Sequence, residues 1–128
     1  IPGYEYRTAE LIQSILTEEF VSEVDGLPGN DDAGAISAWL VFSALGFYPA
    51  CPAVDEYRLG IPLFQKVTIE LDKEYYSGKQ IIIERSKVSA NPARLEEILI
   101  DGKKSDSFGV THKRLTEGVH LKFVDSQE

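Results

Sequence analysis

The first apolar pattern along the chain has helical spacing. Apolar residues recur every three or four positions, which places them along one face of a helix. They are Leu11, Ile12, Ile15, Leu16 and Phe20. Thr8 is a candidate N-cap, and Glu10 follows in the first turn, where a carboxylate is favourable. The pattern therefore predicts a helix over residues 8–20 and, from the Asp-Gly and Pro-Gly turn signals that follow, a loop over residues 22–31.

The second apolar segment, residues 32–45, has hydrophobic residues on almost every side and few polar ones. Asp31 or Asp32 can cap the start of this predicted helix, and Gly46 can follow its last turn. A helix of this composition needs protein on all sides. The helix over residues 8–20 is too small to supply that cover, so we expect either further protein or self-association through this helix.

The second half of the chain has the pattern of strands. Short runs rich in aliphatic residues are separated by turn residues, as at Ser77-Gly78 and Asp101-Gly102. The runs are residues 67–71, 80–84, 95–100 and 120–124. The first alternates apolar and polar side chains, as a half-buried strand does, whereas residues 81–83 are all isoleucine, as in a strand covered on both faces. We therefore predict an α+β protein in which helices precede a small antiparallel β-sandwich.

Composition excludes several classes. The chain has 128 residues, with 21 acidic and 13 basic side chains and a net charge of −8, which disfavours nucleic acid as a partner. No apolar stretch approaches the roughly 20 residues of a membrane span. Cys51 is the single cysteine, so no internal disulfide is expected. Because the chain has no Met and begins at Ile1, we expect that residue 1 is not a natural start.

The acidic turn Asn30-Asp31-Asp32 allows more than one interpretation from the residues alone. Asn and Asp are favoured at helix N-termini, so capping is the ordinary explanation. Carboxylates are also calcium ligands, but the alternating acidic positions of an EF-hand are missing. Two carboxylates held at the start of a buried helix would also suit acid–base catalysis.

Other side chains that could carry chemistry have ordinary structural explanations. Trp39 lies mid-helix and is expected to pack, and Ser37 and Ser43 have no histidine or acid at triad spacing. His112 and His120 lack further ligands nearby, so no metal site is predicted from the sequence. Cys51 is expected to be inert. The Tyr75-Tyr76 pair at a predicted hairpin tip could contact carbohydrate, although turn tips often carry tyrosine without a role.

Longer motifs carry a family resemblance. Three successive segments carry it: the run 26–34, the Ser-Ala-Trp helix that ends in Gly-Phe-Tyr-Pro at 46–49, and the run 57–64. Together they resemble the C-terminal part of glycoside hydrolase family 92, the calcium-dependent, inverting exo-α-mannosidases. The segments at 99–103 and 110–112 are similar as well. The resemblance implies that residues 1–48 are the last helices of an α/α-toroid catalytic domain. It implies that residues 49–128 are part of a C-terminal β-sandwich.

The resemblance also implies the chemistry. An inverting glycosidase uses one carboxylic acid on the leaving oxygen and an opposed carboxylate on the attacking water, about 6.5–9.5 Å apart. Adjacent residues cannot be both partners, so this turn would supply the base side. Asp32 is favoured as the base and Asp31 as its partner, orienting the water or holding the turn; their order is open. Gly29 would shape the turn, and Asn30 would donate to a sugar hydroxyl.

The rest of the implied machinery lies outside this chain. The general acid and most calcium ligands would come from preceding parts of the parent protein, so the isolated chain is expected to be inactive. Leu40 and Ala33 stand where the family often has tyrosine and cysteine, and Ala35-Ile36 replaces a more polar pair. These exchanges on the helix leave the base assignment unchanged but affect the shape of the pocket.

The expected function is therefore part of an α-mannosidase that removes terminal α-linked mannose from N-glycans or mannans, in the periplasm or outside the cell by family analogy. The alternative is a carbohydrate-binding or structural β-sandwich module without catalysis. Linkage preference depends on pocket residues that are expected outside this chain.

Overall fold

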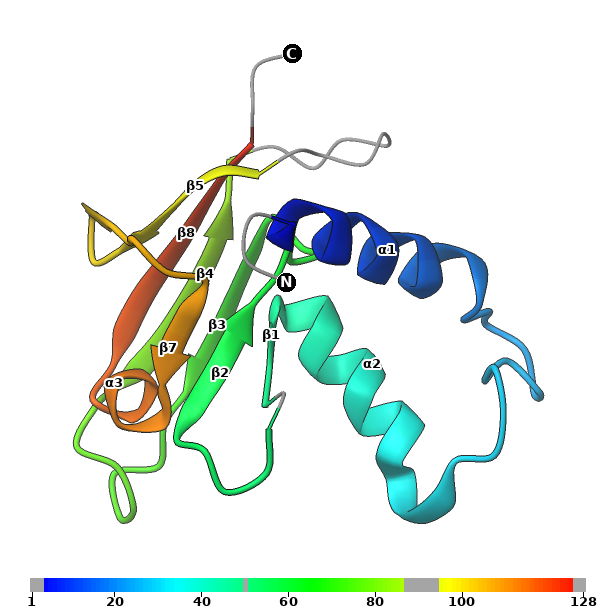
Figure 1. The fold of residues 1–128 in the computed structure, drawn as a ribbon. Helices are drawn as coiled ribbons and strands as arrows, with labels where there is room; N and C mark the ends of the chain where they lie inside the picture. Colours follow the sequence, from blue (N-terminus) through cyan, green and yellow to red (C-terminus); the bar gives the residue numbers. More distant parts are fainter. Residues whose placement is uncertain (1–3, 50, 87–94, 126–128) are drawn as a thin grey trace.

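The computed structural model describes residues 4–49, 51–86 and 95–125. Three α-helices and a short 3-10 helix lie among these residues: α1 (Glu5–Glu18), η1 (Asp32–Gly34), α2 (Ala35–Leu45) and α3 (His112–Thr116). The strands are β1 (Phe47–Tyr48), β2 (Glu56–Leu59), β3 (Lys66–Glu70), β4 (Gln80–Arg85), β5 (Leu95–Ile100), β6 (Lys103–Lys104), β7 (Gly109–Thr111) and β8 (Val119–Asp125). In Figure 1, α1 and α2 lie to one side of the strands, and α3 lies at one end of them.

The first helix agrees with the apolar stripe but not with the predicted cap. Helix α1 begins at Glu5, so Thr8 lies inside the helix, and the prediction of Thr8 as N-cap is wrong. The N-cap position is Tyr4, which makes no side-chain capping bond. Leu16 is buried whereas Leu11 is 61% exposed, so only part of the stripe faces protein within the described residues.

The second helix begins later than predicted and ends as predicted. Residues 32–34 form a 3-10 turn, and the regular helix starts only at Ala35 because Ala33 and Gly34 have positive φ angles. At the other end, Gly46 has φ +85° and closes the helix, as expected for a glycine after the last turn. A Cβ at Gly46 would lie 2.9 Å from the ring of Pro62, so no larger residue fits there.

The strands form two sheets. One has the order β1-β2-β7 and the other β3-β4-β8-β5-β6. All four predicted strands are present, whereas β1, β2, β6, β7 and helix α3 were not predicted. The prediction of a purely antiparallel arrangement needs one correction, since β4 and β8 pair in parallel, with Ile83 opposite Leu121. In the sequence, β4 precedes β5 and β8 follows it. In the sheet, β8 lies between β4 and β5.

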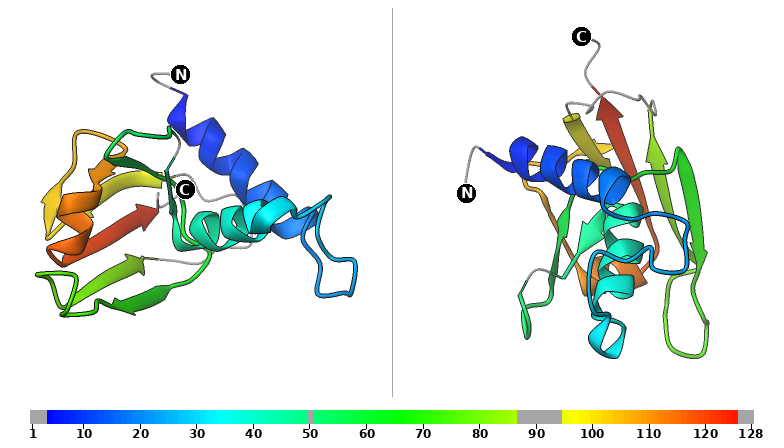
Figure 2. Two further views of the ribbon diagram at one scale, coloured as in Figure 1. Left: turned by 90° about the horizontal axis from the view of Figure 1, so that it is seen from below. Right: turned by 90° about the vertical axis from the view of Figure 1, so that its right-hand side faces the viewer.

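One hydrophobic core joins the two sheets. Phe47 and Leu59 from the smaller sheet pack in the same cluster as Ile83, Leu121 and Phe123 from the larger one, and the last three are fully buried. Helix α2 packs against this core through Phe42 and Leu45. Figure 2 shows α1 and α2 together on one side of the strands from two further directions. The α+β class predicted from the sequence is confirmed.

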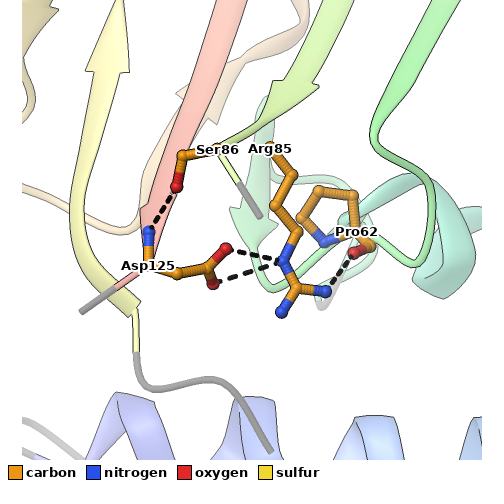
Figure 3. Close-up of polar contacts among 4 residues, drawn as sticks. All are labelled: Pro62, Arg85, Ser86 and Asp125. Atoms are coloured by element: carbon orange, nitrogen blue, oxygen red, sulfur yellow. Dashed lines mark hydrogen bonds and ion pairs between the residues drawn. The ribbon is translucent and has the colours of Figure 1, made fainter. Parts of the chain in front are cut away.

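A buried ion pair fastens the ends of two neighbouring strands. Arg85 at the end of β4 donates from Nε to both carboxylate oxygens of Asp125 at the end of β8, at 3.0 and 3.2 Å. Its Nη1 donates to the carbonyl oxygen of Pro62 at 3.0 Å (Figure 3). The arginine side chain is 1% exposed and the aspartate side chain 4%. This pair therefore ties the larger sheet to the segment that follows α2 and β2.

Candidate active site

The acidic turn lies at the start of α2, at the end of that helix away from β1 (Figure 1). Gly29, Asn30, Asp31 and Asp32 are consecutive there and run into η1. A Cβ at Gly29 would meet the side chain of Ile36 at 3.7 Å, which is ordinary contact. Asn30 is exposed, so its side-chain amide faces solvent.

Asp31 uses both of its carboxylate oxygens to hold the first turn of α2. Oδ1 accepts from the backbone N–H of Ile36 at 2.8 Å and from that of Ser37 at 3.0 Å. Oδ2 accepts from the hydroxyl of Ser37. The Ser37 hydroxyl, followed by the backbone N–H groups, lowers the pKa of Asp31 below its ordinary value of 3.8. Asp31 therefore caps the helix from outside it and is held ionised.

Asp32 has different surroundings from its neighbour. It is exposed, and its side chain accepts no hydrogen bond from any residue that the structure describes. The backbone after it is left-handed over two residues, with φ +53° at Ala33 and +78° at Gly34. Of the two adjacent carboxylates, Asp32 is thus the one with oxygens available to a water molecule or a ligand.

Sequence reasoning missed Ser37 as a partner of this turn. It considered serine only as a nucleophile, and a serine six positions after an aspartate has no standard capping spacing. The contact forms because the 3-10 turn and the left-handed residues bring Asp31 back over the first turn of α2. No pattern in the sequence predicts this left-handed turn before α2.

A cavity of about 660 Å³ lies elsewhere, between α1, α2, the smaller sheet and the segment before β7. Trp39 and Ser43 of α2 line it, with Ala9 of α1 and Arg58 of β2. Trp39 also stacks on Phe20, with 5.8 Å between ring centroids, as its expected packing role requires. Asp31 and Asp32 are absent from the lining. The cavity and the acidic turn are therefore separate features.

The two histidines have protein partners in different places. Nδ1 of His112 lies 3.1 Å from the hydroxyl of Tyr57, and Nε2 of His120 lies 2.9 Å from Oε2 of Glu84. The hydrogen bond from Lys66, and then the one from His120, lowers the pKa of Glu84. Within the described ranges, no three side chains of His, Cys, Asp or Glu gather as a metal ion would need.

Three further residues that could carry chemistry lie on the surface. Cys51 is exposed and has a free thiol. Tyr75 and Tyr76 lie between β3 and β4 and are 73% and 38% exposed, with the ring of Tyr76 set edge-on to His112 at 6.5 Å. No helix among the described residues is long and apolar enough to cross a membrane.

A family model matches almost the whole chain, and this match shows the family. A model described as the glycosyl hydrolase family 92 catalytic domain matches residues 1–126. The chain belongs to glycosyl hydrolase family 92. This confirms the resemblance seen in the acidic turn and in the segments that follow it.

Solved structures of this family share the fold. A family 92 α-mannosidase from Bacteroides thetaiotaomicron is 31% identical, with a TM-score of 0.82 over 97% of this chain and 16% of its own. The same enzyme in complex with mannoimidazole gives a TM-score of 0.83. An inverting family 92 mannosidase from B. thetaiotaomicron strain VPI-5482 is 30% identical, with a TM-score of 0.81 over 97% of this chain.

A curated relative agrees with these structures. An uncharacterized secreted glycosidase of Arthroderma benhamiae is 24% identical over 123 residues, which are 94% of this chain and 16% of the relative. The chain thus spans only 16% of the length of this curated relative.

Proposed function

We propose that this chain is the C-terminal part of an α-mannosidase that hydrolyses terminal α-linked mannose from N-glycans or mannans with inversion. The observation that carries the proposal is the acidic turn, where one carboxylate is fully hydrogen-bonded and its neighbour is exposed. Family membership and the likeness to structures titled as α-mannosidases, one of them inverting, support it.

In this proposal Asp32 is the general base. It takes a proton from a water molecule as that water attacks the anomeric carbon, while a carboxylic acid elsewhere in the parent protonates the departing oxygen. The two carboxyl groups of an inverting pair stand about 6.5–9.5 Å apart, so Asp31 cannot serve as the acid. In this proposal Gly29 shapes the turn, and the exposed Asn30 donates from its amide to a sugar hydroxyl.

Calcium belongs to the parent protein in this proposal, with its ligands mostly outside this chain. The described residues do not fit a calcium site of their own, because no suitable cluster forms and Asp31 has both oxygens committed to hydrogen bonds. This chain therefore contributes the base side of the reaction and no metal-dependent step is assigned to it.

The proposed architecture divides the chain after β1, between residues 48 and 49. Residues 1–48 close the α/α-toroid catalytic domain, and residues 49–128 form part of the β-sandwich. The exposed side chain of Val41 on α2 supports cover by upstream helices. Strand β1, at the end of the first part, pairs with β2 and so connects that part to the smaller sheet. Because a relative is named a secreted glycosidase, we place the parent outside the cytoplasm, in the periplasm or secreted.

The experiment uses the parent protein with its upstream sequence restored. Mannose release from an α-1,2-mannobioside is followed by proton NMR with and without EDTA, so that the first-formed anomer is seen before it equilibrates. The proposal expects β-mannose first, release that depends on calcium, and no release by the isolated 128-residue chain. Release of α-mannose first would contradict inversion.

A second function comes from a different class. A carbohydrate-binding or structural β-sandwich module would use exposed aromatic residues such as Tyr75 and Tyr76, and it would have no turnover. A restored parent that binds mannan but releases no mannose from any α-mannoside would favour that alternative.

A further inference from the structure

Ser37 has no role assigned so far, yet it hydrogen-bonds to Asp31 of the acidic turn. Asp31 precedes the 3-10 turn and Ser37 follows it, and the contacts between them span residues 32–36. Ser37 supplies two of the three donors to the Asp31 carboxylate, one from its backbone and one from its hydroxyl. The span encloses Asp32 and the two left-handed residues.

The enclosed backbone needs an external tether. Ala33 has φ +53°, a conformation that costs free energy for any residue with a Cβ. Such conformations persist only where surrounding contacts hold them, and they occur often at functional sites. Two backbone hydrogen bonds cross Ala33, from Gly34 to Asp31 and from Ala35 to Asp32, and the side-chain bonds of Asp31 to the first turn of α2 span the whole segment.

We propose that Ser37 is a positioning residue of the acidic turn, whose hydroxyl fixes the Asp31 carboxylate and thereby holds Asp32 as the turn's proton acceptor. This inference rests on the proposed function, since it assigns the base role to Asp32. The inference gives Asp31 and Asp32 different roles. Asp31 has both oxygens occupied and holds the turn, whereas Asp32 is exposed and has its oxygens available.

The position of a general base matters mainly in the transition state. A displaced base leaves substrate binding almost unchanged but misaligns the attacking water, and a misplacement of about 1 Å can cost about 100-fold in rate. Loss of the Ser37 hydroxyl leaves Asp31 with backbone donors alone, so the turn is held at fewer points. The expected consequence is a lower kcat with little change in KM.

The test compares three variants of the restored parent: Ser37→Ala, Ser37→Thr and Ser43→Ala. Threonine keeps the hydroxyl. Ser43 is a matched control because it lies further along α2, is 5% exposed and makes no contact with Asp31. For each variant, kcat and KM on an α-mannoside and the unfolding temperature are measured.

We expect Ser37→Ala to lower kcat by about tenfold or more with KM within about twofold, and Ser37→Thr to restore most of the rate. Ser43→Ala should behave like the wild type. A kcat at the wild-type level in Ser37→Ala would overturn the inference while leaving the proposed function intact. An equal loss in a folded Ser37→Thr variant would also overturn it, because the hydroxyl would then not be the determining group.

Two further outcomes are decisive. If Ser37→Ala does not fold, the threonine variant decides alone: a retained kcat supports the hydroxyl's role, and a loss contradicts it. A wild-type parent that releases no mannose would overturn the proposed function and this inference together, which distinguishes the two failures.

Discussion

At the scale of single residues, two adjacent aspartates have separate roles because of their surroundings. Both were candidates from the sequence, where only their adjacency to a helix start was visible. The structure gives Asp31 three hydrogen-bond donors and leaves Asp32 exposed. Side-chain identity and spacing predicted the turn and the capping. They could not assign different roles to Asp31 and Asp32, because that difference depends on the left-handed backbone at Ala33 and Gly34.

The hydrogen bonds of Asp31 predict how stability depends on pH. Because the folded-state pKa of Asp31 lies below its ordinary value of 3.8, the group stabilises the fold above that pH and loses this contribution as the pH falls through the folded value. Asp31→Asn should therefore lower the free energy of unfolding at pH 7. Its difference from the wild type should shrink in strong acid.

Urea unfolding of the wild type and the variant at pH 7 and about pH 2.5 measures this effect. Asp32→Asn is the matched control and should stay close to the wild type at neutral pH. A difference between Asp31→Asn and the wild type that is the same at both pH values would contradict the assignment.

At the scale of elements, prediction succeeded where a pattern is long. The four longest strands and both long helices were located from apolar periodicity. Strands β1 and β6 have two residues each, and α3 has five, so no period can be read from them. The start of α1 was misplaced because Thr8 has a capping side chain, whereas the actual N-cap, Tyr4, makes no side-chain capping bond.

The Arg85–Asp125 pair gives a prediction at this scale. Breaking a buried ion pair leaves an uncompensated charge, which costs about 3–5 kcal/mol. Asp125→Ala should therefore lower the free energy of unfolding by about that amount, as measured by urea denaturation.

A double replacement separates the pair from its surroundings. Arg85→Met with Asp125→Leu removes both charges and should recover much of the loss, because apolar residues of similar size often replace such pairs without cost. Asp125→Ala with wild-type stability would contradict the role of this pair in tying β4 to β8.

At the scale of the whole molecule, the sequence could not give the order of the strands. The parallel pairing of β4 with β8 joins segments separated by β5, β6, β7 and α3, and it depends on contacts that form only in the folded chain. The apolar character of α2 was visible in the sequence, and it implied that more protein covers this helix. In the structure Val41 is 58% exposed on α2, which agrees with that expectation.

The exposed face of α2 predicts self-association of the isolated chain. Exposed apolar surface that lacks its natural cover favours contact with a second copy. Sedimentation velocity at rising concentration should show association of the 128-residue chain, and Val41→Glu should weaken it. Val54→Glu is the matched control, because Val54 is similarly exposed at 54% but lies between β1 and β2.

Equal effects of the two glutamate substitutions would place the association elsewhere on the surface. A wild-type chain that stays monomeric at all concentrations would contradict the prediction of self-association.

The most direct test of the central claim is the rate of mannose release by the restored parent carrying Asp32→Ala. General-base catalysis contributes about 100-fold to 10,000-fold to a reaction, so kcat should fall by at least about 100-fold while the unfolding temperature stays near that of the wild type. A kcat equal to that of the wild type would reduce Asp32 to a residue of the turn and would move the base to Asp31 or to another part of the parent.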